Sequence, residues 1–383
     1  MSYSLPYILL LTFYGFLAYL YEQIDNEFRK KQISIVAVLV FFIFFAFRGY
    51  LYTDWVSYVQ YFENIEWNHA IINDIDGEDF KEPGFALLTV LCKTFVNNYF
   101  FLVFVCTSID TYLFLRFLKR RDINNIALVF MLFITFEGLS IMFNLLRNAL
   151  SLFIFMNAIE YIEKRKPIAY FSLCIIALSI HLSSIMYFPL YFFLHKKLNK
   201  WIFLGVFTGC LFFYISNSSL IFTLASLSGL DGPLGDKLNI YTELFSTSRV
   251  LSLTGTIEKV ALTTLVFLYY DEIIDQLKGR IVIINSLLCY LIMYYMLAEF
   301  NTFSYRMSIL FIFSYWILWG DIIKVLYVKN NKRIVSALIY IYCIYVTIFA
   351  VSTPIQQYDN ILFGAKSYQE RLNIFNRTYQ ADE

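Results

Sequence analysis

The sequence predicts an all-α, polytopic integral membrane protein, and its composition and hydropathy pattern support this class. Of the 383 residues, 59% are hydrophobic and only 15% are charged, whereas soluble domains carry about 25% charged residues. Apolar runs close to the length of a bilayer crossing recur from one end of the chain to the other. We therefore expect one membrane domain over residues 1–383.

Hydropathy places about twelve transmembrane helices along the chain. Their expected ranges are 4–21, 33–47, 99–118, 126–144, 148–162, 168–181, 182–195, 201–217, 252–270, 281–298, 306–322 and 334–350. Residues 168–195 fit a hairpin broken near His181, although one long tilted helix would also fit. The segment 85–97 is short for a crossing and contains Lys93. We expect it to be a re-entrant or interfacial helix that begins at Pro83.

The charges of the loops predict their sides of the membrane. Clusters of Lys and Arg follow about every second expected helix, at 29–31, 119–121, 164–166, 196–200, 278–280 and 324–333. The other loops are acidic or mixed, at 48–84, 218–250, 299–305 and 352–383. Because cytoplasmic loops are enriched in Lys and Arg, we expect the first set inside and both termini outside. Loops 48–84 and 218–250 then form part of an outer, active-site face.

Several classes of partner and cofactor lack support in the sequence. The net charge is +1, so no basic field indicates nucleic acid. The six cysteines lie in apolar stretches, without the spacing of a zinc site or a polar loop for a disulfide. The acidic run NDIDGED lacks the ligand spacing of a calcium loop. We expect no metal and no cofactor.

Three arginines lie at the expected outer ends of helices, where basic residues are normally depleted. They are Arg48, Arg147 and Arg306. The planar guanidinium group binds diphosphate oxygens with two parallel hydrogen bonds. We expect these three to bind a diphosphate, and the alternative is that each side chain reaches toward lipid headgroups.

Proton acceptors are expected on the same face. The candidates, in falling order of preference, are Glu82, Asp54, His181 and Glu137. Glu82 and Asp54 could instead cap helices, and His181 could be a hydrogen-bonded core histidine. Glu137 lies inside an expected membrane helix, where a charge is costly and is normally paired or functional.

Aromatic side chains are frequent in the stretch FRGYLYTDWVSYVQYFENIEW, which begins at the end of the second expected helix. Aromatic faces stack on the apolar faces of sugar rings. We expect a sugar-binding surface formed by Trp55, Tyr58, Tyr61 and Trp67. The alternative is an aromatic belt at the membrane surface.

Four stretches in this order resemble the EpsG family of exopolysaccharide and O-antigen polymerases, the Wzy-like proteins. They are the stretch quoted above, EPGFALLTVLCKTFVNNYFFLV, RNALSLFIFMNAIEYI and IHLSSIMYFPLYFF. The resemblance covers residues 35–195, and later only SYRMSILF is suggestive. A glycine often precedes the aspartate motif of this family, whereas Thr53 precedes Asp54 here.

The resemblance implies an enzyme of the bacterial cytoplasmic membrane. It would join undecaprenyl-diphosphate-linked oligosaccharide units on the outer face, moving the growing chain onto a new lipid-linked unit. Its partners would be these lipid-linked donors and acceptors, membrane lipid and a chain-length regulator protein, without nucleic acid.

Three other functions are compatible with the sequence. An O-antigen ligase would use the same chemistry with a different acceptor. A flippase or transporter of lipid-linked sugar predicts inverted repeats and broken helices at the midplane, whereas the charges here gather on one face. A polysaccharide O-acyltransferase would need a well-placed histidine, for which only His181 is available.

Overall fold

The computed structural model describes residues 3–68, 82–216, 253–298 and 301–380. Every named element in these ranges is helical, and the one bridge between extended residues joins Arg48 and Asn360. The chain divides into two compact units, residues 1–191 with 328–383 and residues 192–327. The single membrane domain over 1–383 stays a prediction, and each unit is described by itself.

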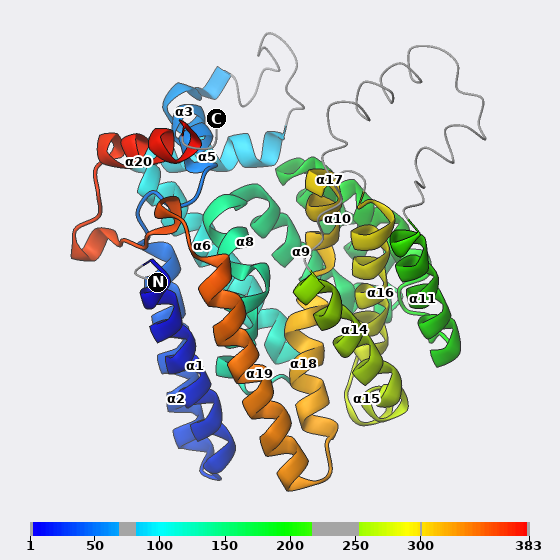
Figure 1. The fold of residues 1–383 in the computed structure, drawn as a ribbon. Helices are drawn as coiled ribbons and strands as arrows, with labels where there is room; N and C mark the ends of the chain where they lie inside the picture. The colour runs from blue at the N-terminus through cyan, green and yellow to red at the C-terminus, as the bar shows by residue number, and fades with distance from the viewer. Residues whose placement is uncertain (1–2, 69–81, 217–252, 299–300, 381–383) are drawn as a thin grey trace. The chain divides into compact units, whose positions relative to one another are not determined.

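The first unit holds the N-terminal half of the chain and the C-terminal segment (Figure 1). Its elements are α1 (Leu5–Gln23), α2 (Glu27–Ala46), α3 (Trp55–Asn64), α5 (Pro83–Phe95), α6 (Tyr99–Arg120), α7 (Ile126–Phe133), η1 (Ile134–Gly138), α8 (Leu139–Asn144), α9 (Leu146–Glu163), α10 (Pro167–Ile180), η2 (Leu182–Phe192), α19 (Lys329–Ala350), η4 (Pro354–Gln356), η5 (Ile361–Phe363) and α20 (Tyr368–Gln380).

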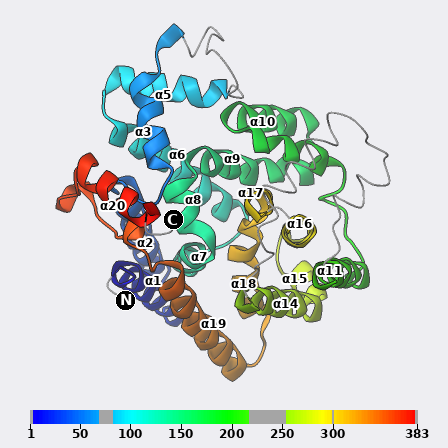
Figure 2. The same ribbon diagram turned by 45° about the horizontal axis from the view of Figure 1, so that its top comes forward.

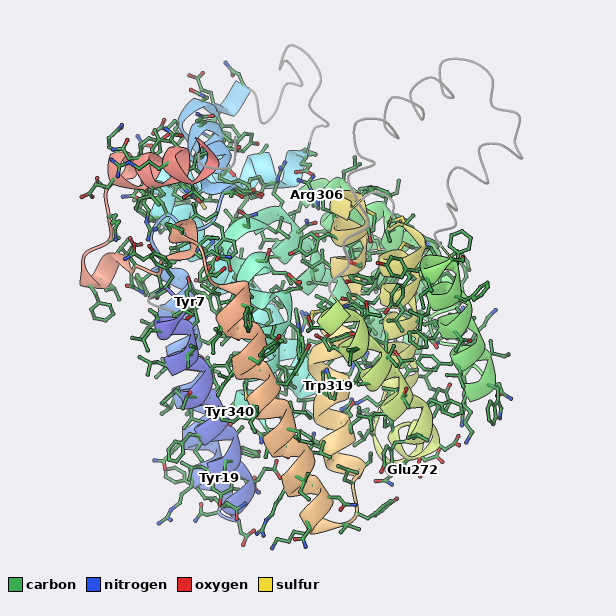
Figure 3. The ribbon with its side chains drawn as sticks, viewed as in Figure 1. Tyr7, Tyr19, Glu272, Arg306, Trp319 and Tyr340 are labelled. Carbon is green, nitrogen blue, oxygen red and sulfur yellow. The ribbon has the colours of Figure 1, made fainter. Side chains whose placement is uncertain are left out.

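Aromatic packing forms the core of this unit. Phe41 of α2 stacks on Phe130 of α7 with ring centroids 4.2 Å apart, and Phe114 of α6 lies 5.7 Å from Phe130. Gly15 lets α19 approach α1, because a Cβ there would lie 2.6 Å from the Tyr340 ring (Figure 3). Small residues permit such close helix contacts within membranes.

The expected hairpin at residues 168–195 is present. Helix α10 ends at Ile180, and His181 is extended at φ −153° and ψ 126°. The hydroxyl of Tyr170 donates to the carbonyl of Tyr187 at 2.5 Å, so η2 runs back along α10. The turn of this hairpin therefore carries His181.

Helix α5 has the properties of an interfacial helix. Its 13 residues extend about 20 Å, short of the ~30 Å hydrocarbon core. It runs across the direction of α1 and α2 in both ribbon views (Figures 1 and 2). Leu87, Leu91 and Phe95 are exposed at every fourth position along it. The stripe fits burial in a membrane surface, and the non-crossing role stays a prediction.

The second unit is also helical. Its elements are α11 (Lys200–Ile215), α14 (Leu253–Leu268), α15 (Tyr270–Gln276), α16 (Arg280–Met296), α17 (Asn301–Ser308), η3 (Ile309–Phe311) and α18 (Phe313–Val325). A buried ion pair between Arg280 and Asp321 joins α16 to α18, with the two shortest contacts at 2.6 and 3.0 Å. The predicted outer loop 218–250 lies outside the described residues.

Four described helices are long and apolar enough to cross a membrane: Leu5–Gln23, Tyr99–Arg120, Ile126–Asn144 and Lys329–Ala350. A fifth is possible if Phe303–Phe311 and Phe313–Val325, bent by 47°, act as one. The chain is thus a multi-pass, all-helical membrane protein. All twelve expected ranges are largely helical, but a count of about twelve crossings stays a prediction, as does the placement of both termini outside.

Labelling of introduced cysteines tests this topology. Ser57 and Asn331 are both exposed, and loop charges place Ser57 outside and Asn331 inside. In intact spheroplasts, a membrane-impermeant maleimide should react with Ser57→Cys and should reach Asn331→Cys only after permeabilisation. The unmodified chain is the control, since five of its six cysteines are buried. Outside labelling of Asn331→Cys without Ser57→Cys would invert the topology.

Candidate functional site

A carboxylate that is shared by an arginine and a histidine side chain forms the centre of the site. Glu82 lies directly before α5, Arg147 is in the first turn of α9, and His181 lies between α10 and η2. Arg147 Nη1 donates to Glu82 Oε2 at 2.7 Å, and His181 Nδ1 lies 2.7 Å from Glu82 Oε1. Arg147 and His181, which follow Glu82 by 65 and 99 residues, therefore meet it at one carboxyl group.

Local structure brings these side chains together. Pro83 occupies the first turn of α5, where its missing N–H costs nothing. A Cβ on Gly84 would lie 2.3 Å from Ser179 Oγ. Glycine at this position therefore permits the start of α5 to rest against the end of α10. The N–H of Leu182 then donates to Glu82 Oε1 at 3.0 Å.

The tautomer of His181 follows from its partners. An ionised carboxylate only accepts hydrogen bonds, so the proton resides on Nδ1 and Nε2 of the neutral ring is an acceptor. Ser183 Oγ lies 3.2 Å from this Nε2. Glu82, His181 and Ser183 thus form a chain of hydrogen bonds, in which a hydroxyl group meets a nitrogen able to take its proton.

Electrostatics keep Glu82 ionised. Its side chain is 9% exposed, and burial raises its pKa. The hydrogen bond from His181 and the charge of Arg147 outweigh burial, so the pKa of Glu82 lies below its ordinary value. Burial lowers the pKa of Arg147, but Tyr58 and Glu82 outweigh it and raise the pKa above its ordinary value. The Arg147 side chain is 43% exposed, so a substrate can reach its guanidinium group.

Aromatic rings surround Arg147. Its Cζ atom lies 5.7 Å from the Tyr58 ring and 6.0 Å from the Phe85 ring. Tyr61 stacks beside Phe85, with centroids 5.9 Å apart and an interplanar angle of 24°. Tyr61 is partly exposed, and burial raises its pKa to about 12. The two expected tyrosines therefore border the guanidinium group, together with Phe85, which sequence reasoning missed.

Asp54 lies at the start of α3 and makes no capping hydrogen bond from its side chain. The hydroxyl of Thr53 donates to Asp54 Oδ1 at 2.9 Å. Asn144, at the end of α8, accepts hydrogen bonds from the N–H groups of Thr53 and Asp54 at 3.0 and 2.8 Å. Asn144 thereby holds the loop before α3 against α8, a role that no sequence pattern indicates.

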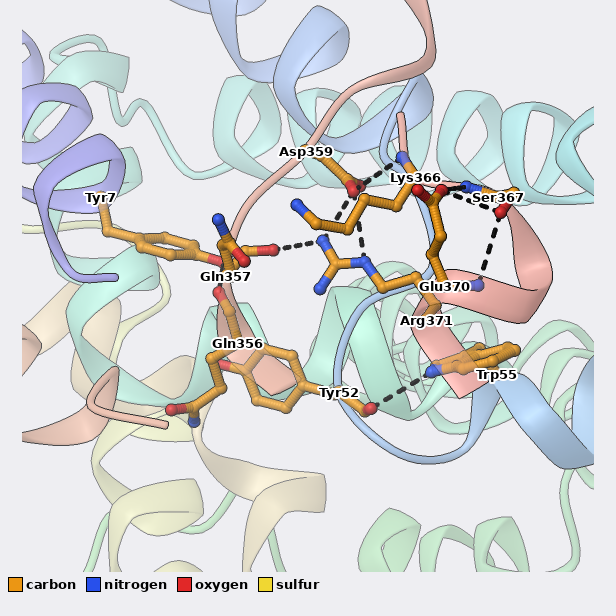
Figure 4. A network of polar contacts seen from close by, with 10 residues as sticks. All are labelled: Tyr7, Tyr52, Trp55, Gln356, Gln357, Asp359, Lys366, Ser367, Glu370 and Arg371. Carbon is orange, nitrogen blue, oxygen red and sulfur yellow. Dashed lines mark hydrogen bonds and ion pairs between the residues drawn. The ribbon is translucent and has the colours of Figure 1, made fainter. Parts of the chain in front are cut away.

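The C-terminal segment covers the loop between α2 and α3 (Figure 4). The N–H of Gly49 donates to the carbonyl of Asp359 at 3.1 Å, and the N–H of Tyr52 donates to Ile355 at 3.1 Å. A buried ion pair of 2.7 Å joins Arg371 of α20 to Asp359. The sequence predicts only a loop of acidic or mixed charge here, because its pattern does not show such long-range pairing.

Arg48 and Trp55 are buried, whereas the roles expected for them need side chains that a ligand can reach. Arg48 is 3% exposed and donates to the carbonyl of Phe45 and to Thr107 Oγ1, at 2.8 and 3.3 Å. Trp55 is 3% exposed, and its ring lies 5.4 Å from Tyr368 of α20. Both side chains pack inside the first unit, where neither presents a free face to a diphosphate or a sugar.

The remaining candidates lie on separate elements. Trp67 is exposed and donates to Thr94 Oγ1 near the C-terminal end of α5. Arg306 is exposed on α17 of the second unit (Figure 3). Glu137 is exposed at a break between α7 and α8. Among the described residues, no group of three His, Cys, Asp or Glu side chains is arranged to hold a metal ion.

Comparison with known proteins identifies a family. The model of the EpsG family matches residues 31–362. No curated protein and no solved structure matches the chain. The matched region includes Glu82, Arg147 and His181 and ends before α20.

The pH dependence of unfolding tests the ionised state of Glu82. Because its folded-state pKa is lowered, its contribution to stability is present above the ordinary glutamate pKa of about 4.3 and is lost as pH falls through the lower folded value. Between pH 6 and pH 3, the wild type should lose thermal stability relative to Glu82→Gln. Glu66→Gln, at an exposed position, should follow the wild type. A pH-independent difference for Glu82→Gln would contradict the assignment.

Proposed function

The chain belongs to the EpsG family, which is associated with polysaccharide polymerisation, and we propose that it joins lipid-linked oligosaccharide units into a polysaccharide. The donor and acceptor are undecaprenyl-diphosphate-linked units, and the reaction takes place on the outer face of the bacterial cytoplasmic membrane. An O-antigen ligase would share this chemistry and differ only in its acceptor.

The observation that carries the proposal is the Glu82 carboxylate held between Arg147 and His181. Polymerisation needs a cation for the leaving diphosphate and a base for the attacking hydroxyl. Arg147 supplies an accessible guanidinium group, and the unprotonated Nε2 of His181 supplies a proton acceptor.

Geometry favours His181 over Glu82 as the base. Both oxygens of Glu82 already accept hydrogen bonds, from Arg147 and from His181 with Leu182. Its lowered pKa also weakens it as a proton acceptor. We therefore assign Glu82, the first candidate base from the sequence, to hold His181 in one tautomer and to stabilise the charged ring once formed, as a triad carboxylate does.

The proposed step is a direct displacement. The acceptor hydroxyl attacks the anomeric carbon of the donor while its proton passes to His181 Nε2. The bond between that carbon and the diphosphate oxygen breaks, and the electron pair leaves with undecaprenyl diphosphate. Negative charge grows on the leaving oxygen, where Arg147 can stabilise it. Tyr61 and Phe85 offer an aromatic surface for a sugar ring.

Purified protein with its lipid-linked repeat unit tests this function. The unit is extracted from cells that lack the chain, so that unpolymerised substrate accumulates. A ladder of products spaced by one unit is expected. Absence of any ladder from well-folded protein would overturn the proposal, and one transfer onto a different acceptor would favour a ligase.

A second candidate function follows from Ser183. Its hydroxyl faces His181 Nε2 at 3.2 Å, the arrangement of an activated nucleophile. A polysaccharide O-acyltransferase would use Ser183 to carry the acyl group. In the polymerase, by contrast, the serine hydroxyl only occupies the place that an acceptor hydroxyl takes.

Ser183→Ala separates the two functions. A polymerase should keep most of its ladder, because the acceptor hydroxyl replaces the lost serine at Nε2. An acyltransferase should lose all acyl transfer, because its nucleophile is gone. Chain length and acyl content of the product are measured together, with Ser57→Ala at an exposed position of α3 as the control.

Arg147→Lys tests the diphosphate role. Lysine keeps the charge but offers a point donor in place of a two-pronged one. By analogy with the loss of one preorganised donor at an oxyanion site, the barrier should rise by about 2.7–4 kcal/mol, a loss of about 100- to 1,000-fold in rate.

The control is Arg377→Lys, at an exposed arginine of α20, which should polymerise at the wild-type rate. Expression and insertion are compared by immunoblotting of membranes. If Arg147→Lys made as much polymer as the wild type at equal expression, the alternative role of Arg147, contact with lipid headgroups, would be favoured.

A further inference from the structure

Three side chains form one stripe along α3. Asp54 lies directly before the helix with helical dihedral angles, φ −71° and ψ −13°. Tyr58 and Tyr61 follow it four and seven residues later. The N–H of Tyr58 donates to the carbonyl of Asp54 at 3.0 Å, as in a regular helix. Residues with this spacing lie on one face of a helix, so the stripe carries a carboxylate at one end and two phenol rings beyond it.

This stripe packs against Arg147 and the start of α5. The Tyr58 ring lies 5.7 Å from Arg147 Cζ, and its centroid lies 6.0 Å from that of Phe85. Tyr61 stacks on Phe85 with centroids 5.9 Å apart. Asp54 therefore lies one helical turn, about 6 Å along the axis, from the contact between Tyr58 and Arg147.

Asn144 gives a second, independent link between Asp54 and Arg147. Its Oδ1 accepts hydrogen bonds from the N–H of Asp54 at 2.8 Å and from the N–H of Thr53 at 3.0 Å. Asn144 ends α8, and Arg147 follows three residues later in the first turn of α9. The turn that presents the guanidinium group thus also holds the backbone of Asp54.

The Asp54 carboxylate is not required for these contacts. An aspartate at the start of a helix normally accepts a hydrogen bond from an N–H of the first turn, but the Asp54 side chain makes no such bond. Its anchoring to Asn144 uses the backbone N–H. Within the described part of the chain, the carboxylate has one hydrogen bond, from Thr53 Oγ1 to Oδ1 at 2.9 Å. The side chain is partly exposed, so Oδ2 is left for a ligand.

The charge of this carboxylate limits what the ligand can be. Arg147 forms its ion pair with Glu82, at 2.7 Å. A second carboxylate beside a diphosphate site is unfavourable because like charges repel. A carboxylate oxygen accepts hydrogen bonds from uncharged donors such as hydroxyl groups. The position of Asp54 therefore suits the sugar next to a bound diphosphate and not the diphosphate itself.

We propose that Asp54 Oδ2 accepts a hydrogen bond from the sugar that is joined to the diphosphate, through the hydroxyl or amide N–H next to the anomeric carbon. This inference rests on the proposed function, which places the diphosphate at Arg147. A sugar that lacks a hydrogen-bond donor at this carbon, through deoxygenation or esterification, is disfavoured. In glycoside hydrolysis, hydrogen bonds at this carbon strengthen in the transition state.

Binding of two lipids to the purified full-length protein in detergent tests this contact. The probes are undecaprenyl diphosphate and undecaprenyl-diphosphate-linked monosaccharide, which carries only the first sugar of the repeat unit. Isothermal titration calorimetry gives both Kd values, and their ratio measures the contribution of the sugar. Loss of a hydrogen bond to a charged acceptor should reduce this ratio about 10- to 150-fold in Asp54→Ala. The affinity for undecaprenyl diphosphate should not fall.

Two further variants separate binding from structure. Asp54→Asn keeps the size of the side chain and a neutral acceptor oxygen, so its ratio should fall less than that of Asp54→Ala. It also carries the test if Asp54→Ala does not fold. Glu63→Ala removes an exposed carboxylate of the same helix and should leave both affinities unchanged. Equal loss of affinity for both lipids in Asp54→Asn would overturn the proposal, because the role of Asp54 would then be structural.

The outcomes distinguish this contact from the proposed function. A wild type that makes no ladder but binds the monosaccharide-linked lipid with a ratio that depends on Asp54 would overturn the polymerase and support the contact. A working polymerase whose ratio is unchanged in Asp54→Asn and in Asp54→Ala would overturn the contact alone.

Discussion

The Glu82 carboxylate is the interaction on which the candidate site depends. It is buried from solvent, yet it stays ionised because Arg147 and His181 both bond to it. Removing one partner of such a buried group leaves a charge without compensation, which costs far more than an exposed ion pair contributes. The same carboxylate sets the tautomer of His181 and orients Arg147. A change to Glu82 would therefore alter both the charge of the site and the orientation of His181 and Arg147.

Packing of the backbone makes that interaction possible. Gly84 allows α5 to meet α10, and Gly49 allows the C-terminal segment to meet the loop after α2, since a Cβ there would lie 1.9 Å from Asp359 Oδ1. These contacts join residues far apart in sequence without long side chains between them. Near the loop between α2 and α3, the buried charges of Asp359 and Arg371 neutralise each other in an ion pair. Small residues and paired charges together let a membrane protein build an ordered polar face.

Backbone strain marks a second place where the fold departs from regular structure. In a hydrocarbon environment the helix satisfies its own polar groups, so breaks are tolerated only where protein or water replaces those bonds. The break at Phe136 and Glu137 lies inside the helical run 126–144. Glu137 is left-handed at this break, a conformation that costs stability in residues other than glycine.

Composition and hydropathy were sufficient to predict the all-helical class, because each apolar run must form helix to satisfy its backbone in lipid. Together with the loop charges, they also predicted the short helix that begins at Pro83 and the hairpin at His181, and they indicated Glu82, Arg147 and His181 as candidate site residues. The tertiary structure decided which of these meet. It placed Arg48 and Trp55 inside the protein and added Asn144 and the C-terminal segment, because contacts over 90 to 310 residues leave no periodic trace in a sequence. Local hydropathy acts along one helix, whereas the site arises where separate helices pack.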